Sequence, residues 1–242
     1  MSEGLPTVTL SIVSHAQNSL VNQLLSDLAA SAAADLPIVL TENVPDITAL
    51  DVPARLRVER VRNDAPKGFG ANHNAAFRRC ATPVFVVLNP DIRLERDPFH
   101  ALAARVTQAG IAAAGPLVRS PLGAVEDSAR KFPTALGLVK KAMRAQVAPD
   151  YPIDRGVVEV DWVAGMCVAL RSEAFRAAGG FDERYFLYYE DVDLCRRLRA
   201  LGYRVVYDPA VCVVHDARRS SRRNPRLALT HAASAIRFLL SA

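Results

Sequence analysis

Residues that could carry out chemistry stand where predicted strands end. The apolar run Val84–Leu88 is rich in β-branched residues and predicts a buried strand, which stops at Asn89-Pro90-Asp91 because Pro90 cannot donate to a sheet. Ligands bind at the carboxyl ends of strands in open α/β sheets. Asp91 is therefore well placed to hold a divalent cation against phosphate oxygens. The alternative is a plain strand-ending turn, since Asn, Pro and Asp are common turn residues.

A second acidic group, the Glu190-Asp191 pair, begins a helix predicted to run through Leu201. The positive end of the helix dipole stabilises carboxylates there, which is also the purely structural explanation for the pair. Aromatic residues between Phe181 and Tyr189 precede the pair and suit contact with a sugar and partial exclusion of water. Because loss of water raises the pKa of a carboxyl group, such a carboxylate is a better general base.

His215 follows a predicted apolar strand and is a candidate ligand for the same metal as Asp91. A lone histidine is more often an ordinary surface or core residue. Directly after it, residues 218–226 contain five arginines. This basic cluster favours an anionic partner, such as a nucleic acid, a lipid headgroup or a diphosphate, although a solvated surface loop explains the charge equally well.

Size and composition favour one cytoplasmic domain. The chain has 242 residues, of which 50% are hydrophobic, and a net charge of +5. We expect a single domain over residues 1–242, because no linker or repeat is evident. Residues 1–6 lack the pattern of a signal peptide, and no apolar run reaches the length of a membrane span. Four scattered cysteines argue against a disulfide framework or a zinc site, and we expect buried thiols.

Hydrophobic periodicity predicts an α/β protein whose central sheet is not parallel throughout. A glycine-containing loop with Gly68 and Gly70 precedes one helix, whose free N–H groups suit an anion. Residues 151–157 show no periodic signal and are the candidate for a mobile loop. The predicted strands cover residues 7–13, 36–41, 55–61, 84–88, 111–118, 157–163, 166–170, 203–207 and 211–214. The predicted helices cover about 20–28, 71–79, 97–109, 136–147, 172–178, 190–201 and 225–242.

Taken together, these motifs resemble the family 2 inverting glycosyltransferases, especially the bacterial rhamnosyltransferase-like branch. Each motif is weak alone, but the set is in the family's order and spans nearly the whole chain. The matching segments are Ser11-Ile-Val, Gly68-Phe-Gly-Ala-Asn72, Leu88-Asn-Pro-Asp91, Lys131-Phe-Pro-Thr134, Asp161-Trp-Val-Ala-Gly165, Gly179-Gly-Phe-Asp-Glu183, Glu190-Asp-Val-Asp-Leu194 and His215.

The resemblance implies a glycosyltransferase A-type fold, a Rossmann-like nucleotide-diphospho-sugar transferase fold with a mixed central sheet. Residues up to about 118 would bind a nucleotide-sugar, and residues from about 119, including the C-terminal helix, would bind the acceptor. By residue-to-residue match, Asp191 would be the catalytic base with Glu190 beside it, and Asp91 and His215 would hold Mg²⁺ or Mn²⁺. The implied donor-binding residues are Ser14, His15, Glu42, Gly68, Asn72, Asn89, Asp91, Arg218 and Arg219. The implied acceptor-binding residues are Trp162, Gly165 and Tyr189.

The implied reaction is a single in-line displacement that moves a sugar from a dTDP- or UDP-sugar, with dTDP-rhamnose expected, to a hydroxyl of a polysaccharide or lipid-linked acceptor. Three departures from the family pattern affect the donor site. Ser14-His15-Ala16 replaces Thr-Tyr-Asn, Glu42 replaces Asp, and the metal motif has one carboxylate rather than two. These changes fall on the residues expected to set the nucleoside preference and the metal affinity.

Three alternatives to a transferase remain open at this point. One is a catalytically silent nucleotide-sugar-binding relative, and another is a sugar nucleotidyltransferase, although the sequence lacks a loop suited to a triphosphate. A nucleic-acid binder is disfavoured, because no aromatic residues interleave the basic cluster. The arginines and the C-terminal helix also suit peripheral contact with the inner face of an anionic membrane, against the alternative that this helix simply packs on the domain.

Overall fold

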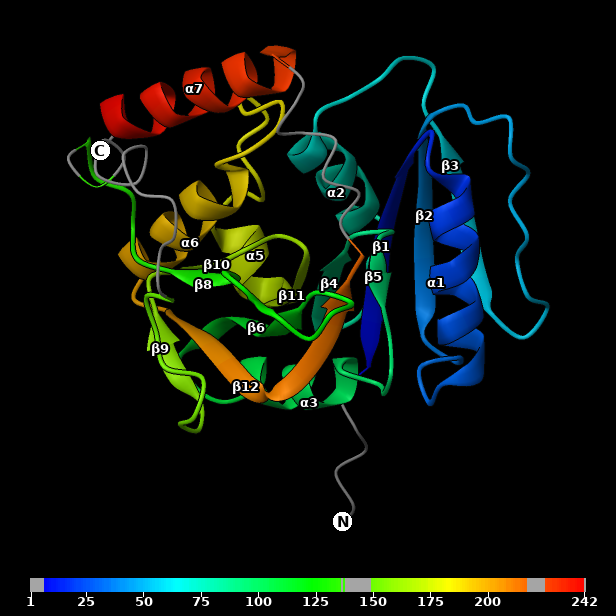
Figure 1. The fold of residues 1–242 in the computed structure, drawn as a ribbon, viewed down its shortest axis with the longest axis horizontal. Coiled ribbons are helices and arrows are strands. Elements are labelled where there is room, and N and C mark those ends of the chain that lie inside the picture. The colour runs from blue at the N-terminus through cyan, green and yellow to red at the C-terminus, as the bar shows by residue number, and fades with distance from the viewer. Residues whose placement is uncertain (1–6, 136, 138–148, 217–224, 242) are drawn as a thin grey trace.

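The computed structural model describes residues 7–135, 137, 149–216 and 225–241, which form a mixed sheet between two layers of helices (Figure 1). Along the main path of the sheet, the strands are β3 (Arg57–Arg62), β2 (Pro37–Val44), β1 (Val8–His15), β4 (Val84–Leu88), β11 (Cys167–Arg171), β6 (Ile111–Arg119), β12 (Arg204–His215) and β5 (Ile92–Arg93). Off this path, β7 (Val125–Glu126) pairs with β6 and β9 (Val158–Val160) pairs with β12; a separate pair joins β8 (Ala129–Arg130) to β10 (Trp162–Val163).

Strand direction changes in the middle of the sheet. Strands β3, β2, β1 and β4 are mutually parallel, whereas β11 is antiparallel to both β4 and β6. The register pairs Cys167 with Leu88, so β11 begins at the edge of the sheet where β4 ends. This confirms the expected mixed sheet.

Both faces of the sheet are apolar, as expected for strands covered on two sides. In β4, Val84, Val86 and Leu88 face one layer, and Phe85 and Val87 face the other. The first layer contains α1 (Asn18–Ala30) and α3 (Phe99–Val106). The second contains α2 (Phe69–Phe77), α5 (Ser172–Ala177) and α6 (Glu190–Ala200), with α7 (Pro225–Leu240) packed outside α6 (Figure 1).

Several sequence predictions differ from the structure in detail. The two strands predicted over 203–207 and 211–214 form one strand, β12, because a bulge between Asp208 and Cys212 preserves the pairing with β6. The helix predicted over 97–109 ends at Val106, and the one predicted over 71–79 spans Phe69–Phe77. The thiols of Cys80 and Cys212 are only half-buried, whereas Cys167 and Cys195 are buried as expected. The helix predicted over 136–147 lies almost wholly outside the described residues.

Two further expectations concern mobility and the membrane. Residues 151–157 contain neither helix nor strand, and their mobility stays a prediction. In the described part of the chain, no helix combines the length and apolarity that a membrane crossing requires. The division into halves near residue 118 also stays a prediction.

Candidate active site

The turn after β4 lies against the end of β12. His215 pairs with Ile92 of β5, and the backbone N–H of Asp216 donates to the carbonyl of Asp91 at 2.8 Å. This brings Nε2 of His215 to 3.2 Å from Oδ2 of Asp91. The other oxygen of Asp91, Oδ1, is buried and has no hydrogen-bond partner among the described residues. The two predicted metal ligands are therefore adjacent, although 124 positions separate them in the sequence.

Glu126, which sequence reasoning did not single out, approaches His215 from another side. Its Oε2 lies 2.7 Å from Nδ1 of the imidazole. Burial lowers the pKa of His215, but hydrogen bonds and charge interactions with Asp91 and Glu126 outweigh it and raise the pKa to about 9. In the metal-free protein, the imidazole is consequently a cation between two carboxylates at neutral pH.

Two hydrogen bonds connect the turn after β4 to the start of α6. The N–H of Asn89 donates to the carbonyl of Met166 at 2.8 Å. The backbone N–H of Gly165, the residue before Met166, donates to Oδ2 of Asp191 at 2.9 Å. Asp191 and the Asp91–His215 pair therefore lie at the same edge of the sheet, and the backbone of residues 165–166 connects them.

Burial dominates the electrostatics of the acidic pair. It raises the pKa of Asp191, against the opposing effect of the N–H groups of Gly165 and Val192. Burial and the charge of Asp191 together raise the pKa of Glu190 well above its usual value. Both carboxyl groups therefore hold a proton more readily than exposed carboxyl groups do.

Strained backbone precedes this pair. Tyr188 and Tyr189 have φ angles of 69° and 70°, which non-glycine residues rarely adopt. Contacts from two helices hold the segment in place. The N–H of Phe69 in α2 donates to the carbonyl of Phe186 at 2.8 Å, and Oγ of Ser234 in α7 donates to the carbonyl of Leu187 at 2.9 Å.

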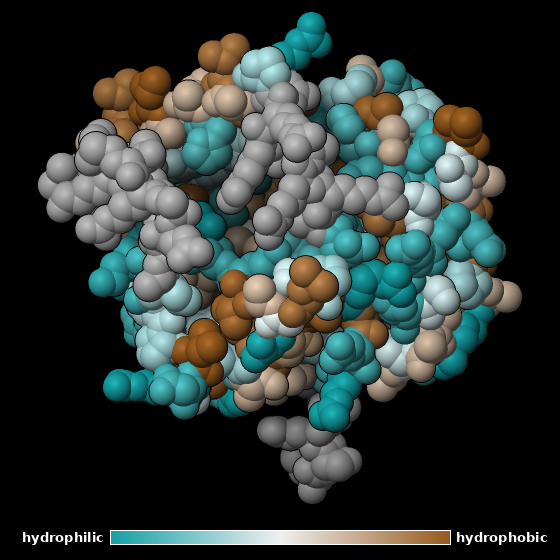
Figure 2. All heavy atoms as spheres, viewed as in Figure 1, coloured by the Kyte–Doolittle hydropathy of each residue, from teal (hydrophilic) through white to brown (hydrophobic). Residues whose placement is uncertain are grey.

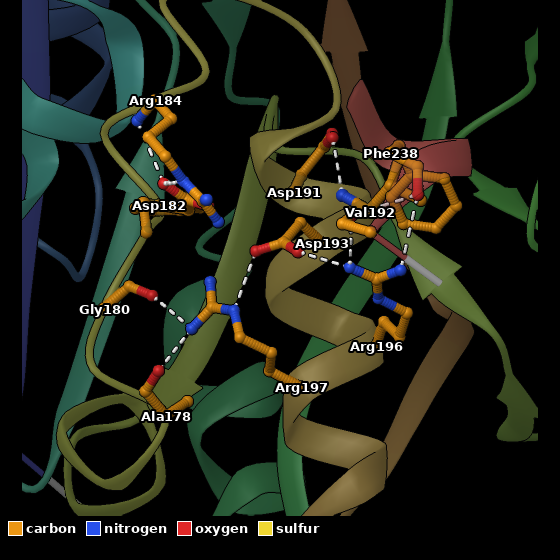
Figure 3. Close-up of polar contacts among 12 residues, drawn as sticks. Ala178, Gly180, Asp182, Arg184, Asp191, Val192, Asp193, Arg196, Arg197 and Phe238 are labelled. Carbon is orange, nitrogen blue, oxygen red and sulfur yellow. Dashed lines mark hydrogen bonds and ion pairs between the residues drawn. The ribbon is translucent and has the colours of Figure 1, made fainter. Parts of the chain in front are cut away.

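Asp193, the last acidic residue of the Glu-Asp-Val-Asp motif, anchors α6. Its carboxylate pairs with Arg196 at 2.9 Å and with Arg197 at 2.7 Å. Arg197 also donates to the carbonyls of Ala178 and Gly180, which ties α6 to the end of α5. Figure 3 shows Asp191 and Asp193 pointing to different sides of the helix, so the motif separates a candidate catalytic group from a structural one.

Five of the predicted donor-binding residues lie where β1, β2 and the glycine-containing loop meet, and most of them are engaged within the protein: Ser14, His15, Glu42, Gly68 and Asn72. Ser14 Oγ donates to Asn18, and buried Glu42 pairs with Arg60 at 2.8 Å and Arg62 at 3.4 Å. His15 is exposed, with Nδ1 2.9 Å from the amide nitrogen of Asn43.

An amide network positions the glycine-containing loop. Asn63 donates to both Asn43 and Asn72, and Asn72 donates in turn to the carbonyl of Gly68 at 2.9 Å. Gly68 packs so closely that a Cβ there would lie 2.7 Å from the carbonyl oxygen of Phe186. Close packing against Phe186 is therefore sufficient to explain why residue 68 is a glycine, and no ligand is needed to explain it.

The predicted acceptor-binding residues lie beside Asp191. Trp162 is largely buried, with Arg130 over its ring at 5.4 Å from the centroid, and Tyr189 packs against His231 and Phe238 of α7. Arg218 and Arg219 lie outside the described residues. A separate open hollow of about 610 Å³, between α2 and α5, contains none of the predicted site residues.

The site residues fit a divalent cation that a substrate helps to hold. In the described residues, no three His, Cys, Asp or Glu side chains converge as ligands. Asp91 and His215 together offer one carboxylate and one imidazole, and the unpartnered Oδ1 of Asp91 is free to coordinate. Cations such as Mg²⁺ commonly take few protein ligands and complete their shell with phosphate and water oxygens.

The fold is that of glycosyltransferases of the A type. It superposes on a crystal structure of GalNAc-T7 with UDP, GalNAc and Mn²⁺, with a TM-score of 0.67, 15% identity, and coverage of 90% of this chain and 44% of that one. It also superposes on the mannosyltransferase PcManGT from Pyrobaculum calidifontis, in complex with GDP-Man and Mn²⁺, with a TM-score of 0.63, 16% identity, and coverage of 96% and 64%.

The chain belongs to the family described as "Glycosyltransferase like family 2", whose profile it matches over residues 6–230. It is 33% identical over 204 residues to the N-acetylglucosaminyl-diphospho-decaprenol L-rhamnosyltransferase of Mycobacterium tuberculosis, covering 78% of this chain and 65% of that protein. It is 29% identical over 227 residues to rhamnosyltransferase WbbL of Escherichia coli, covering 89% and 85%. The family and fold expected from the sequence are thereby confirmed.

Replacing Asp193 with Asn tests its anchoring role. Because the change leaves two arginines without their shared carboxylate, we expect the free energy of unfolding to fall by about 2 kcal/mol, measured by urea denaturation. Glu159→Gln is the control, since it breaks the exposed pair with Arg199 on the same helix and should change stability by less than about 1 kcal/mol. Equal losses in the two variants would contradict the anchoring role.

Proposed function

We propose that this protein transfers rhamnose from dTDP-rhamnose, or a related sugar from a dTDP- or UDP-sugar, to a hydroxyl of a polysaccharide or lipid-linked glycan. The observation that carries the proposal is that Asp191 and the Asp91–His215 pair lie at one edge of the sheet, connected through the backbone of residues 165–166. The two rhamnosyltransferase relatives support the choice of sugar. The name of the mycobacterial relative supports a diphospho-polyprenol acceptor carrying N-acetylglucosamine.

In the proposed reaction, Asp191 removes a proton from the acceptor hydroxyl, whose oxygen attacks the anomeric carbon and inverts it. The Gly165 N–H keeps one carboxylate oxygen oriented, and the raised pKa makes Asp191 a stronger base. Tyr189, Trp162 and Gly165 border the acceptor. No covalent intermediate between sugar and enzyme is required, because a single displacement accounts for transfer.

On the donor side, Asp91 and His215 would hold Mg²⁺ or Mn²⁺. The bound cation would neutralise charge on the departing nucleoside diphosphate. In this proposal, Ser14, His15, Glu42 and Asn89 border the nucleotide, and Gly68 and Asn72 set the shape of the adjoining loop. Arg218 and Arg219 are proposed to add positive charge near the diphosphate.

Asp191→Asn should abolish transfer and leave binding of the nucleotide-sugar largely intact, because the amide keeps the shape but cannot accept the proton. Transfer is measured by product formation, and binding by titration calorimetry. The variant should remain folded, which its melting temperature checks, because the lost repulsion with Glu190 offsets the loss of one of the two backbone hydrogen bonds that Asp191 accepts. In the parent protein, kcat/KM should fall as pH drops through the raised pKa of Asp191, because the base must be deprotonated.

Normal turnover by Asp191→Asn would remove Asp191 as the base. If kcat/KM instead falls only at the pH where an ordinary exposed carboxylate is protonated, burial does not raise the pKa of Asp191.

Removal of divalent cations should abolish transfer, since Asp91 and His215 alone cannot neutralise a leaving diphosphate. We expect EDTA-treated protein to be inactive and added Mn²⁺ or Mg²⁺ to restore product formation. In the Asp91→Asn variant, added Mn²⁺ or Mg²⁺ should not restore product formation. Full activity after chelation would overturn the proposed metal role.

We also propose that the outer face of α7 contacts an anionic lipid surface. Ser234, Ala235 and Phe238 are buried against the domain, whereas Leu229, Ile236 and Leu240 are 70%, 58% and 82% exposed. Because successive residues of a helix are rotated by 100°, Leu229, Ile236 and Leu240 form one apolar stripe on the side of α7 opposite its buried face. Figure 2 shows apolar side chains gathered over α7 at the upper left.

Charge and position favour a lipid partner for this stripe. Arg226 and Arg237 lie on one flank of it by the same helical geometry, and residues 218–226 contain five arginines. The inner face of α7 contacts the segment that leads into Asp191, through the Ser234–Leu187 hydrogen bond. A lipid-linked acceptor would thus meet the site from the side on which α7 lies.

Replacing Leu229, Ile236 and Leu240 with Ser should abolish cosedimentation with vesicles of phosphatidylglycerol and phosphatidylcholine. The control replaces Ile47 and Leu122, which are even more exposed but lie outside α7, with Ser and should sediment like the parent protein. Binding to pure phosphatidylcholine vesicles should be weak. Binding that ignores lipid charge, or survives the α7 changes, would contradict the proposed contact.

A further inference from the structure

Sheet register places Glu126 beside His215. In β7, Glu126 pairs with Val118 of β6, and Val118 pairs with Val213 of β12. Because alternate residues of a strand share a face, His215 projects from the same face as Val213, and therefore from the same face as Glu126. The pairing of three strands thus brings Glu126 and His215 together.

The two carboxylates occupy different sides of the imidazole. Glu126 Oε2 lies 2.7 Å from Nδ1, and Asp91 Oδ2 lies 3.2 Å from Nε2. A histidine that coordinates through Nε2 must have an unprotonated Nε2, so its remaining proton must sit on Nδ1. An acceptor at Nδ1 selects this tautomer and fixes the plane of the ring.

We propose that Glu126 is a positioning residue, which accepts the Nδ1–H of His215 and so directs Nε2 toward the cation shared with Asp91. This inference rests on the proposed function, because it presumes that the Asp91–His215 pair binds a divalent cation. Glu126 would not itself coordinate, since it contacts the ring nitrogen farther from Asp91. Its role is to set the direction and the tautomer of the ligand.

The affinity for Mn²⁺ in the presence of dTDP tests the proposal, measured from the free-Mn²⁺ signal in electron paramagnetic resonance. We expect Glu126→Ala to weaken binding 10- to 100-fold, the usual effect of losing such a partner. Glu126→Gln should stay within about threefold of the parent protein, because its amide oxygen still accepts the Nδ1–H. Glu95→Ala, which removes an exposed carboxylate near Asp91 in the chain, is the control and should leave affinity unchanged.

A second measurement separates positioning from general stability. In the diamagnetic Mg²⁺–dTDP complex, the ¹⁵N shifts of His215 should report a protonated Nδ1 and an unprotonated Nε2 in the parent protein and in Glu126→Gln. This pattern should be lost in Glu126→Ala, even if the melting temperature is unchanged. The His215 signals are assigned with His215→Gln.

The possible failures are distinguishable. If Glu126→Ala binds Mn²⁺ like the parent protein while Asp91→Asn loses it, the positioning role is overturned and the metal site stands. If the parent protein with dTDP binds no Mn²⁺, the metal role proposed for Asp91 and His215 is overturned, together with this inference.

Discussion

The antiparallel pairing of β11 with β4 is the constraint on which the site depends. Parallel strands all end at the same edge of a sheet, and an antiparallel neighbour begins there. The register of Cys167 against Leu88 therefore brings residues 165 and 166 to the edge where β4 delivers Asn89 and Asp91. Because Gly165 also donates to Asp191, one strand pairing sets the separation between the candidate metal site and the candidate base.

The start of α6 combines destabilising groups with strong anchoring. Two carboxylates with raised pKa values follow two residues in left-handed backbone geometry, and each of these features is unfavourable by itself. The segment is retained because Asp193 ties the helix to α5 through Arg197, and because α2 and α7 hold the preceding backbone. The strained segment that leads into Asp191 is thus stabilised by contacts from other parts of the protein.

The two sides of the site use different chemistry for support. On the proposed donor side, asparagine amides hold the glycine-containing loop, with Asn63 bridging Asn43 and Asn72. At the candidate metal site, the carboxylates of Asp91 and Glu126 flank the imidazole of His215, whose pKa is raised to about 9. Neutral amides fix the shape of the loop without adding charge, whereas two carboxylates near one imidazole favour positive charge there.

Local signals allowed the sequence by itself to determine the class of fold and to indicate the residue types of the candidate site. The run Val84–Leu88 and the stop at Pro90 are local, as is the acidic start of α6, so periodicity and turn chemistry were sufficient to predict them. The sequence also indicated the family, since its motifs keep their order along the chain. It did not indicate that Gly68 is a packing requirement, because the neighbour concerned is the backbone of Phe186.

Only the tertiary structure decided which residues meet. Glu126 and His215 are 89 positions apart and touch because β7, β6 and β12 pair in one register. The bulge that joins the two predicted C-terminal strands into β12 likewise depends on β6. The physical reason is that local propensity acts over a few residues, whereas strand register and side-chain contacts arise from packing between distant segments.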